Sequence, residues 1–344
     1  MTTSDPGSPE SRRSFGWRAP HVAVLLGAVS IAFAGACSGD DSPATTDAGA
    51  AVTEPTIWLE SSSSLDPTAL PLGDQHYVTD APKQGYVYVC DARMFQQTGA
   101  PGSQQDGDWI KPAAGTYDVT KKPFVQGNVH YSDAEFTITT TEDQRVIDGN
   151  GLPLGVPTGI FPVQASDPAY TYDPNPNEVT SQDISFSIPH NPTVAKSASC
   201  TYKEVGITLD GVPLHGPLDS TGRDELAHEL QDVCTGAPQP GGGYHRHALS
   251  ECMPHIHERN ALVGYALDGF GIFSPYDENG DELTSADLDE CHGMTSEIVW
   301  EGKKVSMYHY VMTRDYPYTV ACFKGTPTRN AFPPLPGAPP QQLK

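Results

Sequence analysis

Short runs in which apolar and polar residues alternate are the feature that most constrains the fold of this chain. Such runs occupy residues 86–89, 136–139, 184–188 and 206–209, and they are rich in β-branched and aromatic residues. Alternation with a period of two is typical of strands that bury one face. The 33 glycines and 32 prolines add turn signals between the runs, which favours short strands over long helices. We therefore expect a mainly β fold, an antiparallel β-sandwich-like domain with few short helices and with disulfides.

The N-terminus has the pattern of an export signal. Arg12 and Arg13 lie before an uncharged apolar run over about residues 22–34. This run has about 13 residues, whereas about 20 are needed to span a bilayer, so residues 1–36 are predicted to be a cleaved signal peptide. The arginine pair also resembles a twin-arginine signal, so the general and the twin-arginine export routes both stay open.

The end of this segment resembles a lipobox. Small residues at 34–36 precede Cys37, which would become the lipidated N-terminus after cleavage. We therefore predict an exported lipoprotein that is anchored to a membrane of the cell envelope through Cys37. Ordinary cleavage after Ala36, which would release a secreted protein, is the alternative.

Composition divides the rest of the chain into a tether, a folded part and a tail. Residues 37–55 are predicted to be a flexible tether, and residues 326–344 a Pro-rich tail. Residues 56–140 form an N-terminal β segment, which is either a separate module or the first strands of the main domain. One short helix is expected over residues 224–230, with Ser220 or Thr221 as a candidate N-cap.

The cysteine count fits export. The chain has 7 cysteines, and lipidation of Cys37 would leave an even set of six. An even set outside the cytosol indicates three disulfides, and fifteen pairings remain possible. The six candidates are Cys90, Cys200, Cys234, Cys252, Cys291 and Cys322.

The charge and the absent motifs exclude several function classes. The chain has 43 acidic and 20 basic residues and a net charge of −23, which argues against a nucleic-acid partner because a basic surface is needed to bind phosphates. The sequence contains no phosphate loop and no dinucleotide fingerprint, so no nucleotide cofactor is expected. It also lacks the Gly-x-Ser-x-Gly and His-Glu-x-x-His motifs of hydrolases.

Histidines gather in one part of the chain. Nine of the 12 lie between residues 190 and 310, and two pairs have the spacing His-x-His. On a strand, residues i and i+2 point to the same face, so each pair would present two imidazoles together. The pairs are His245 with His247 and His255 with His257. If they faced each other, three or four imidazole nitrogens could surround one ion.

Imidazole-rich sites suit transition metals. We predict a copper or zinc site, in which binding weakens below about pH 6.5 because only the neutral imidazole is a ligand. One alternative is that the histidines form an ordinary polar strand face. Another is a blue-copper-like set of Cys252, Met253 and a nearby histidine, which a disulfide at Cys252 would rule out. The predicted metal ligands are His245, His247, His255, His257 and His309.

Several ordered blocks resemble one known family. Gly-Tyr-His-Arg-His at residues 243–247, Gly-Tyr-Ala-Leu-Asp-Gly-Phe at 264–270, Asp-Glu-Cys-His-Gly at 289–293 and Tyr-His-Tyr at 308–310 are similar to segments of the YHYH-domain family of exported bacterial proteins. The resemblance covers about residues 145–325. It implies a β-rich extracytoplasmic domain with a cluster of His, Tyr and Asp residues, and it leaves the activity open.

The chain departs from the family pattern at three positions. Arg246 stands where the family has Tyr, but both histidines of that block remain. Val311 stands where a second histidine is expected, so a site that used it has lost a donor. Gly271 replaces a common Pro in a loop.

Three residues near the candidate ligands could support them. Asp268 could orient a ligating imidazole, or it could instead form an Asx turn. Tyr244 and Tyr308 each precede a candidate histidine and could hydrogen-bond the ligands, although packing in the core is their ordinary role.

These observations favour a cell-envelope lipoprotein that binds a transition metal through clustered histidines. The rival interpretation is a non-enzymatic binding or structural protein, in which histidines and tyrosines form a groove for a glycan or another envelope component. A small-molecule or envelope ligand is expected in either case, but the sequence does not identify it.

Overall fold

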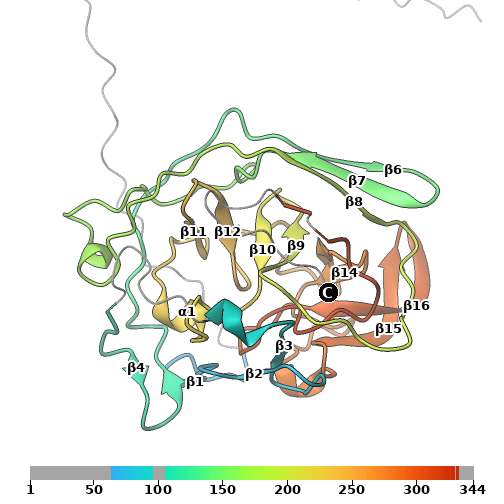
Figure 1. Ribbon diagram of the computed structural model, residues 1–344, viewed down its shortest axis with the longest axis horizontal. Helices are drawn as coiled ribbons and strands as arrows, with labels where there is room; N and C mark the ends of the chain where they lie inside the picture. The colour runs from blue at the N-terminus through green and yellow to red at the C-terminus, as the bar shows by residue number, and fades with distance from the viewer. Residues whose placement is uncertain (1–62, 96–104, 330, 333–344) are drawn as a thin grey trace, which may run out of the picture. The chain divides into compact units, whose positions relative to one another are not determined.

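A sheet of eight strands organises residues 204–311 in the computed structural model, which describes residues 63–95, 105–329 and 331–332 (Figure 1). Its strand order is β11-β12-β10-β9-β13-β14-β16-β15. The β10–β12 and β14–β16 pairs are parallel, and the other neighbours are antiparallel. The strands are β9 (Glu204–Thr208), β10 (Pro213–His215), β11 (Gly236–Pro238), β12 (Tyr244–Arg246), β13 (Leu262–Ala266), β14 (Gly271–Phe273), β15 (Gly293–Trp300) and β16 (Lys303–Val311).

Three smaller sheets precede it along the chain. β6, β7 and β8 form an antiparallel sheet, β1, β5 and β4 form a second one, and β2 pairs with β3 in parallel. Their bounds are β1 (Leu70–Pro71), β2 (Tyr77–Val78), β3 (Val87–Tyr88), β4 (Ile110–Lys111), β5 (Thr116–Tyr117), β6 (Phe136–Thr140), β7 (Gln144–Gly149) and β8 (Ile184–Pro189).

The prediction of a mainly β fold with antiparallel-rich sheets is confirmed. Each of the four alternating runs overlaps a strand, namely β3, β6, β8 and β9. In β8 the alternation is visible in the structure, because Ile184, Phe186 and Ile188 are buried while the residues between them are more exposed. The parallel pairs within the large sheet were not expected, because no local sequence pattern reports the direction of a distant partner strand.

The predicted helix is present but shorter than expected. The described residues contain one α-helix, α1 (Glu225–His228), within the predicted 224–230. The expected cap was wrong: Asp224 is the N-cap, and its side chain accepts a hydrogen bond from the backbone N–H of Ala227. Three short 3₁₀ helices occupy Ala92–Phe95, Pro168–Thr171 and Ser285–Asp287.

The longest hairpin, β15–β16, is closed by a two-residue turn. Trp300 pairs with Lys303, and the turn residues Glu301 and Gly302 have φ angles of 51° and 75°. A type I′ turn needs positive φ at both positions, and it matches the natural twist of the two strands.

One apolar core joins the large sheet to the β6–β8 sheet. Ile147 and Ile184 from the smaller sheet pack with Ile207, Leu214 and Ile272 from the larger one. A second core packs the N-terminal β segment around α1, where Trp109 donates a hydrogen bond from Nε1 to the carbonyl oxygen of Ala227 at 2.9 Å.

Three disulfides link the six cysteines. They join Cys90 to Cys200, Cys234 to Cys252, and Cys291 to Cys322. Disulfides persist in oxidising compartments, so the set suggests an extracytoplasmic protein. Because Cys252 is bonded to Cys234, it offers no thiolate, which excludes the blue-copper-like alternative.

The signal peptide, Cys37 and the tether lie outside the described residues, as does most of the Pro-rich tail. The first residues of the tail are described and contact the core: Thr328 donates to the carbonyl oxygens of Leu267 and Ser187, and Ala331 is buried. No helix of the described part of the chain is long and apolar enough to cross a membrane.

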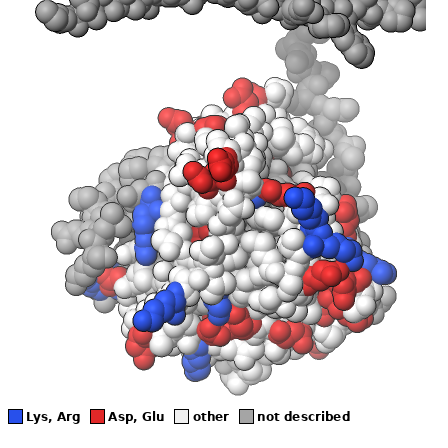
Figure 2. Space-filling model, turned by 90° about the vertical axis from the view of Figure 1, so that its right-hand side faces the viewer, with Lys and Arg blue, Asp and Glu red and all other residues white. Residues whose placement is uncertain are grey.

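Acidic and basic side chains are interspersed on the face shown in Figure 2, with broad uncharged areas between them. The net charge of −23 therefore does not gather into one acidic patch on this face.

Candidate metal centre

Three histidines meet on one side of strands β10 and β12. In this parallel pair Leu214 lies opposite Arg246, so the neighbouring His215, His245 and His247 point to the other face of the sheet. The ring centroids are 4.1 Å apart for His215 and His245, 4.9 Å for His245 and His247, and 5.4 Å for His215 and His247. The exposed fraction is 2% for His215, 5% for His245 and 7% for His247.

Helix α1 brings two glutamates to the same place. Glu225 and Glu229 are four residues apart, a spacing that places side chains on one side of a helical turn. The Oε1 atom of Glu225 lies 3.4 Å from Nε2 of His247. Figure 1 shows α1 close to β11 and β12. The cluster thus combines imidazoles from the sheet with carboxylates from the helix.

These side chains form two overlapping groups of possible metal ligands. One group is His215, His245 and His247, and the other is Glu225, Glu229, His245 and His247. Within each group the ligand atoms lie within 4.8 Å of one another. The buried cluster could therefore hold a metal ion.

Unsatisfied polar atoms concentrate here. Among the described residues, five buried side-chain nitrogen or oxygen atoms have no hydrogen-bond partner. Three of them are His215 Nδ1, His247 Nε2 and Glu229 Oε2. A buried polar atom without a partner costs about 1–3 kcal/mol, and a cation, which accepts several lone pairs, could satisfy atoms of this cluster together.

Backbone carbonyls orient two of the rings. The Nδ1 atoms of His245 and His247 face the carbonyl oxygens of Gly243 and Gly216. In each ring the carbonyl favours a proton on Nδ1, which leaves a lone pair on Nε2. This arrangement of a ligating imidazole is common in metal sites.

Burial keeps the histidines in the ligating form. It lowers the pKa of His215, His245 and His247, in each case as the largest cause, so the rings are neutral at pH 7. Burial also raises the pKa of Glu225 to about 6, and burial together with the nearby Glu225 raises the pKa of Glu229 well above its ordinary value. A bound cation would favour the ionised carboxylates and release their protons.

Two half-buried lysines lie within the electrostatic field of these glutamates. Burial lowers the pKa of Lys122 to about 8 and lowers that of Lys203, while the charges of Glu225 and Glu229 oppose both shifts. Lys122 donates to Gln231 and Lys203 to Gln239. The lysines thus partly balance the acidic side of the cluster.

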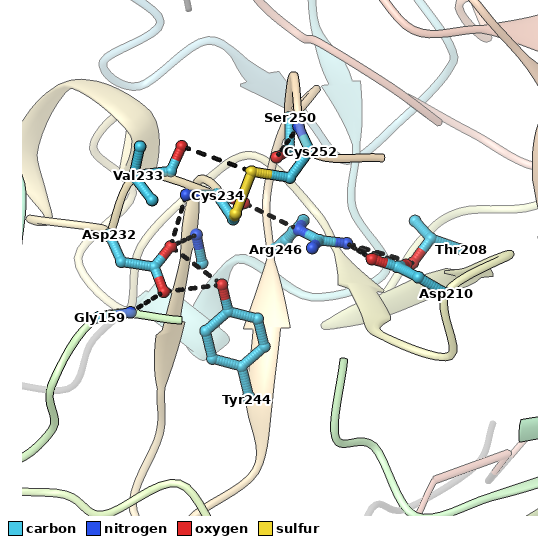
Figure 3. Close-up of a disulfide and its surroundings, with 11 residues drawn as sticks. Gly159, Thr208, Asp210, Asp232, Val233, Cys234, Tyr244, Arg246, Ser250 and Cys252 are labelled. Carbon is cyan, nitrogen blue, oxygen red and sulfur yellow. Dashed lines mark hydrogen bonds and ion pairs between the residues drawn. A yellow bond between two sulfur atoms is a disulfide. The ribbon is translucent and has the colours of Figure 1, made fainter. Parts of the chain in front are cut away.

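The opposite face of β12 is fixed by a buried polar network next to the Cys234–Cys252 disulfide (Figure 3). Tyr244 donates to both carboxylate oxygens of Asp232 at 3.0 Å. Arg246 pairs with Asp210 at 2.8 Å and donates from Nε to the carbonyl oxygen of Cys234 at 2.9 Å. Because residues alternate along a strand, anchoring Tyr244 and Arg246 fixes the direction of the two histidines.

The second His-x-His pair lies elsewhere. His255 and His257 belong to a turn, their side chains are 52% and 53% exposed, and they pair with Glu258 and Glu251. His309 is buried on β16 with its ring centroid 4.8 Å from that of Phe273. Among the described residues, the groups able to hold one ion include His245 and His247 but not these three histidines.

The three predicted supporting residues have other partners. Asp268 accepts hydrogen bonds from Tyr310 at 2.6 Å and from the backbone N–H of Gly325 at 2.8 Å. Tyr308 donates to Asp289 at 3.1 Å, and Tyr244 to Asp232 as described above. These bonds tie neighbouring strands and loops together, and none of them reaches a histidine.

The predicted ligands did not include His215, Glu225 and Glu229. His215 has no second histidine at i+2, and its place beside His247 depends on pairing between β10 and β12. The glutamates had a weak signal: their i, i+4 spacing on the predicted helix indicates a shared side, but not what that side contacts.

Comparison with models of protein families identified one match, to the model described as YHYH protein, over residues 185–286. These residues form a YHYH domain. The matched range is shorter than the resemblance over about 145–325, and the blocks at 289–293 and 308–310 lie beyond it. The YHYH domain contains all five possible metal ligands. No curated protein and no solved structure matched the chain significantly.

Proposed function

We propose that the YHYH domain binds one transition-metal ion, copper or zinc, through His215, His245 and His247, with Glu225 or Glu229 completing the coordination. The observation that carries this proposal is that three unsatisfied buried atoms, His215 Nδ1, His247 Nε2 and Glu229 Oε2, belong to two groups of possible ligands that share His245 and His247. Hydrogen bonds inside the protein satisfy most buried polar groups, so this grouping favours a ligand that the cluster is built to receive.

The ligand types narrow the choice of metal. Imidazole nitrogen suits zinc and copper, whereas calcium and magnesium prefer sites made of oxygen atoms alone. Three imidazoles with a carboxylate match the ligand types of zinc sites, and copper also accepts this set. When bound, such an ion supplies Lewis acidity and, in the case of copper, one-electron chemistry.

Metal analysis of the purified protein tests this proposal. We expect about one equivalent of copper or zinc per chain in the wild type and almost none in the double variant His245→Ala/His247→Ala, because two of the three nitrogen ligands are lost. The matched control is His255→Ala/His257→Ala, which removes a pair with the same spacing from an exposed turn. It should keep the wild-type metal content. Equal metal content in the two double variants would contradict the proposal.

We also propose that the protein is held at the cell envelope by a lipid on Cys37. The lipobox-like sequence before Cys37 supports this, and the three disulfides fit the same side of the membrane. The wild type should partition into the detergent phase after phase separation, and Cys37→Ser should move to the aqueous phase. Wild-type protein in the aqueous phase would argue for simple secretion.

A further inference from the structure

A cavity separate from the metal cluster lies between β14, β15, β16 and the loop after β14. Its volume is about 140 Å³, and none of the five possible metal ligands lines it. Phe273, Leu283, Met294 and Val311 supply the apolar part of its wall, and Asn260, Ser274, Tyr276 and Ser296 add polar groups. An apolar cavity of about 150 Å³ can take up benzene, so this one has room for a ligand of roughly six to eight non-hydrogen atoms.

His309 adds an imidazole to the lining of this cavity. The residue is 2% exposed, and its Nδ1 faces the carbonyl oxygen of Met307 at 3.2 Å. That contact favours a proton on Nδ1 and leaves a lone pair on Nε2, for which no hydrogen-bond partner is found among the described residues. Burial lowers the pKa of His309, so the ring is neutral and Nε2 is an acceptor. The cavity therefore offers a fixed acceptor to a ligand N–H group.

Only negative charges line the cavity. Asp277 and Glu278 contribute carboxylates, and no lysine or arginine is among the lining residues. Asp277 forms an Asx turn, in which Oδ1 accepts from the backbone N–H groups of Asn279 and Asp281, and this fixes the loop at the rim. Arg259 lies against Gly280 in the same loop, outside the lining. A cation in the cavity would thus meet carboxylates and a neutral imidazole.

We propose that this cavity is a binding site for a small organic ammonium ion with an apolar body. The ammonium group would donate to His309 Nε2 and lie near Asp277 and Glu278, while the body would contact Phe273 and Met294. Small-molecule sites commonly combine apolar walls with a few polar groups that fix the orientation of the ligand.

Benzylamine and benzyl alcohol form a matched pair of probes. They have the same ring and nearly the same size, but at pH 7 only the amine is charged. Titration of the isotope-labelled, disulfide-bonded protein should give saturable NMR shift changes around Phe273, Met294 and His309. The amine should bind about tenfold more tightly than the alcohol, because a hydrogen bond to a charged group is stronger than a neutral one.

Substitutions test the carboxylate at the rim and His309 separately. Glu278→Gln removes an exposed charge at the rim, so it should weaken the binding of benzylamine by several-fold and leave the affinity for benzyl alcohol unchanged. Asp183 is an exposed carboxylate that does not line the cavity, so Asp183→Asn should change neither affinity. His309→Leu should bring the affinities for the two probes close together. Equal affinity for both probes in the wild type, or shift changes away from the cavity, would overturn the proposal. The result should be the same with metal-free and metal-loaded protein, so its failure is distinct from failure of the metal site.

Discussion

The two His-x-His pairs have the same spacing and lie close together in the sequence, yet they occupy opposite environments. His245 and His247 lie at β12, where every residue is buried, and they contact His215 from the neighbouring strand. His255 and His257 lie in a turn that contains Pro254, and His255 has a φ of 65°. Their side chains face solvent and pair with Glu258 and Glu251.

The His-x-His spacing alone therefore does not make a metal site. Two residues at i and i+2 share a side only while the backbone stays extended. The first pair also has a fixed strand behind it and two neighbours, β10 and α1, that bring further ligands. The second pair has neither, and its half-exposed rings pair with Glu258 and Glu251 instead.

The largest expected effect comes from breaking the network behind the first pair. Arg246→Met leaves Asp210 buried without its cation, and removal of one partner of a buried ion pair costs about 3–5 kcal/mol. We expect the free energy of unfolding, measured by denaturant titration, to fall by about this amount, and metal content to fall with it. Lys304→Met breaks the exposed Lys304–Glu297 pair and should change the free energy of unfolding little.

A second substitution checks this cause. In Arg246→Met/Asp210→Leu no unpaired charge remains, so most of the lost stability should return. A double variant that is less stable than the single variant would show that the ion pair itself, and not the unpaired carboxylate, accounts for the loss.

The next effect is the stabilisation of the folded state by metal. A ligand that binds only the folded protein adds about 2.7 kcal/mol at a concentration of 100 times its Kd. Zinc or copper should therefore raise the Tm of the wild type and of His255→Ala/His257→Ala alike. His245→Ala/His247→Ala should show no rise, and a rise equal to that of the wild type would place the bound ion elsewhere.

Local pattern was enough to predict several parts of this molecule. Residues 184–188 alternate clearly, and β8 buries Ile184, Phe186 and Ile188 as that period requires. Six cysteines left after Cys37 indicated three disulfides, but the pairing of Cys90 with Cys200, which are 110 residues apart, depends on tertiary structure. Patterns of this kind report local geometry and composition, not distant partners.

The candidate metal centre was predictable only where it is local. His245 lies on β12 and His247 directly follows this strand, so their spacing was informative. His215 joins them through a parallel strand pair, and Glu229 through the docking of α1, and both are long-range events. Pro254, directly before the second pair, was the available signal that this pair is not on a central strand.

A smaller effect concerns acid stability. Burial lowers the pKa of His245 and His247 in the folded protein, whereas the unfolded value is about 6.5. The stability that goes with the neutral rings is thus fully present above pH 6.5 and is lost as the pH falls below it, by up to about 1.4 kcal/mol per pH unit for each imidazole. Denaturant titrations of the metal-free protein between pH 7.5 and 4.5 should give a shallower slope for His245→Gln/His247→Gln than for the wild type. Identical slopes would mean that these rings become protonated without unfolding.

The smallest effect is expected from the exposed pair. His255→Ala/His257→Ala removes two ion pairs whose histidines are about half exposed, and such pairs contribute less than about 1 kcal/mol. The free energy of unfolding should therefore stay within about 1 kcal/mol of the wild type. A larger loss would mean that the turn packs on the domain through these rings. The two pairs would then both be structural elements of the fold, and the contrast between them would rest on metal binding alone.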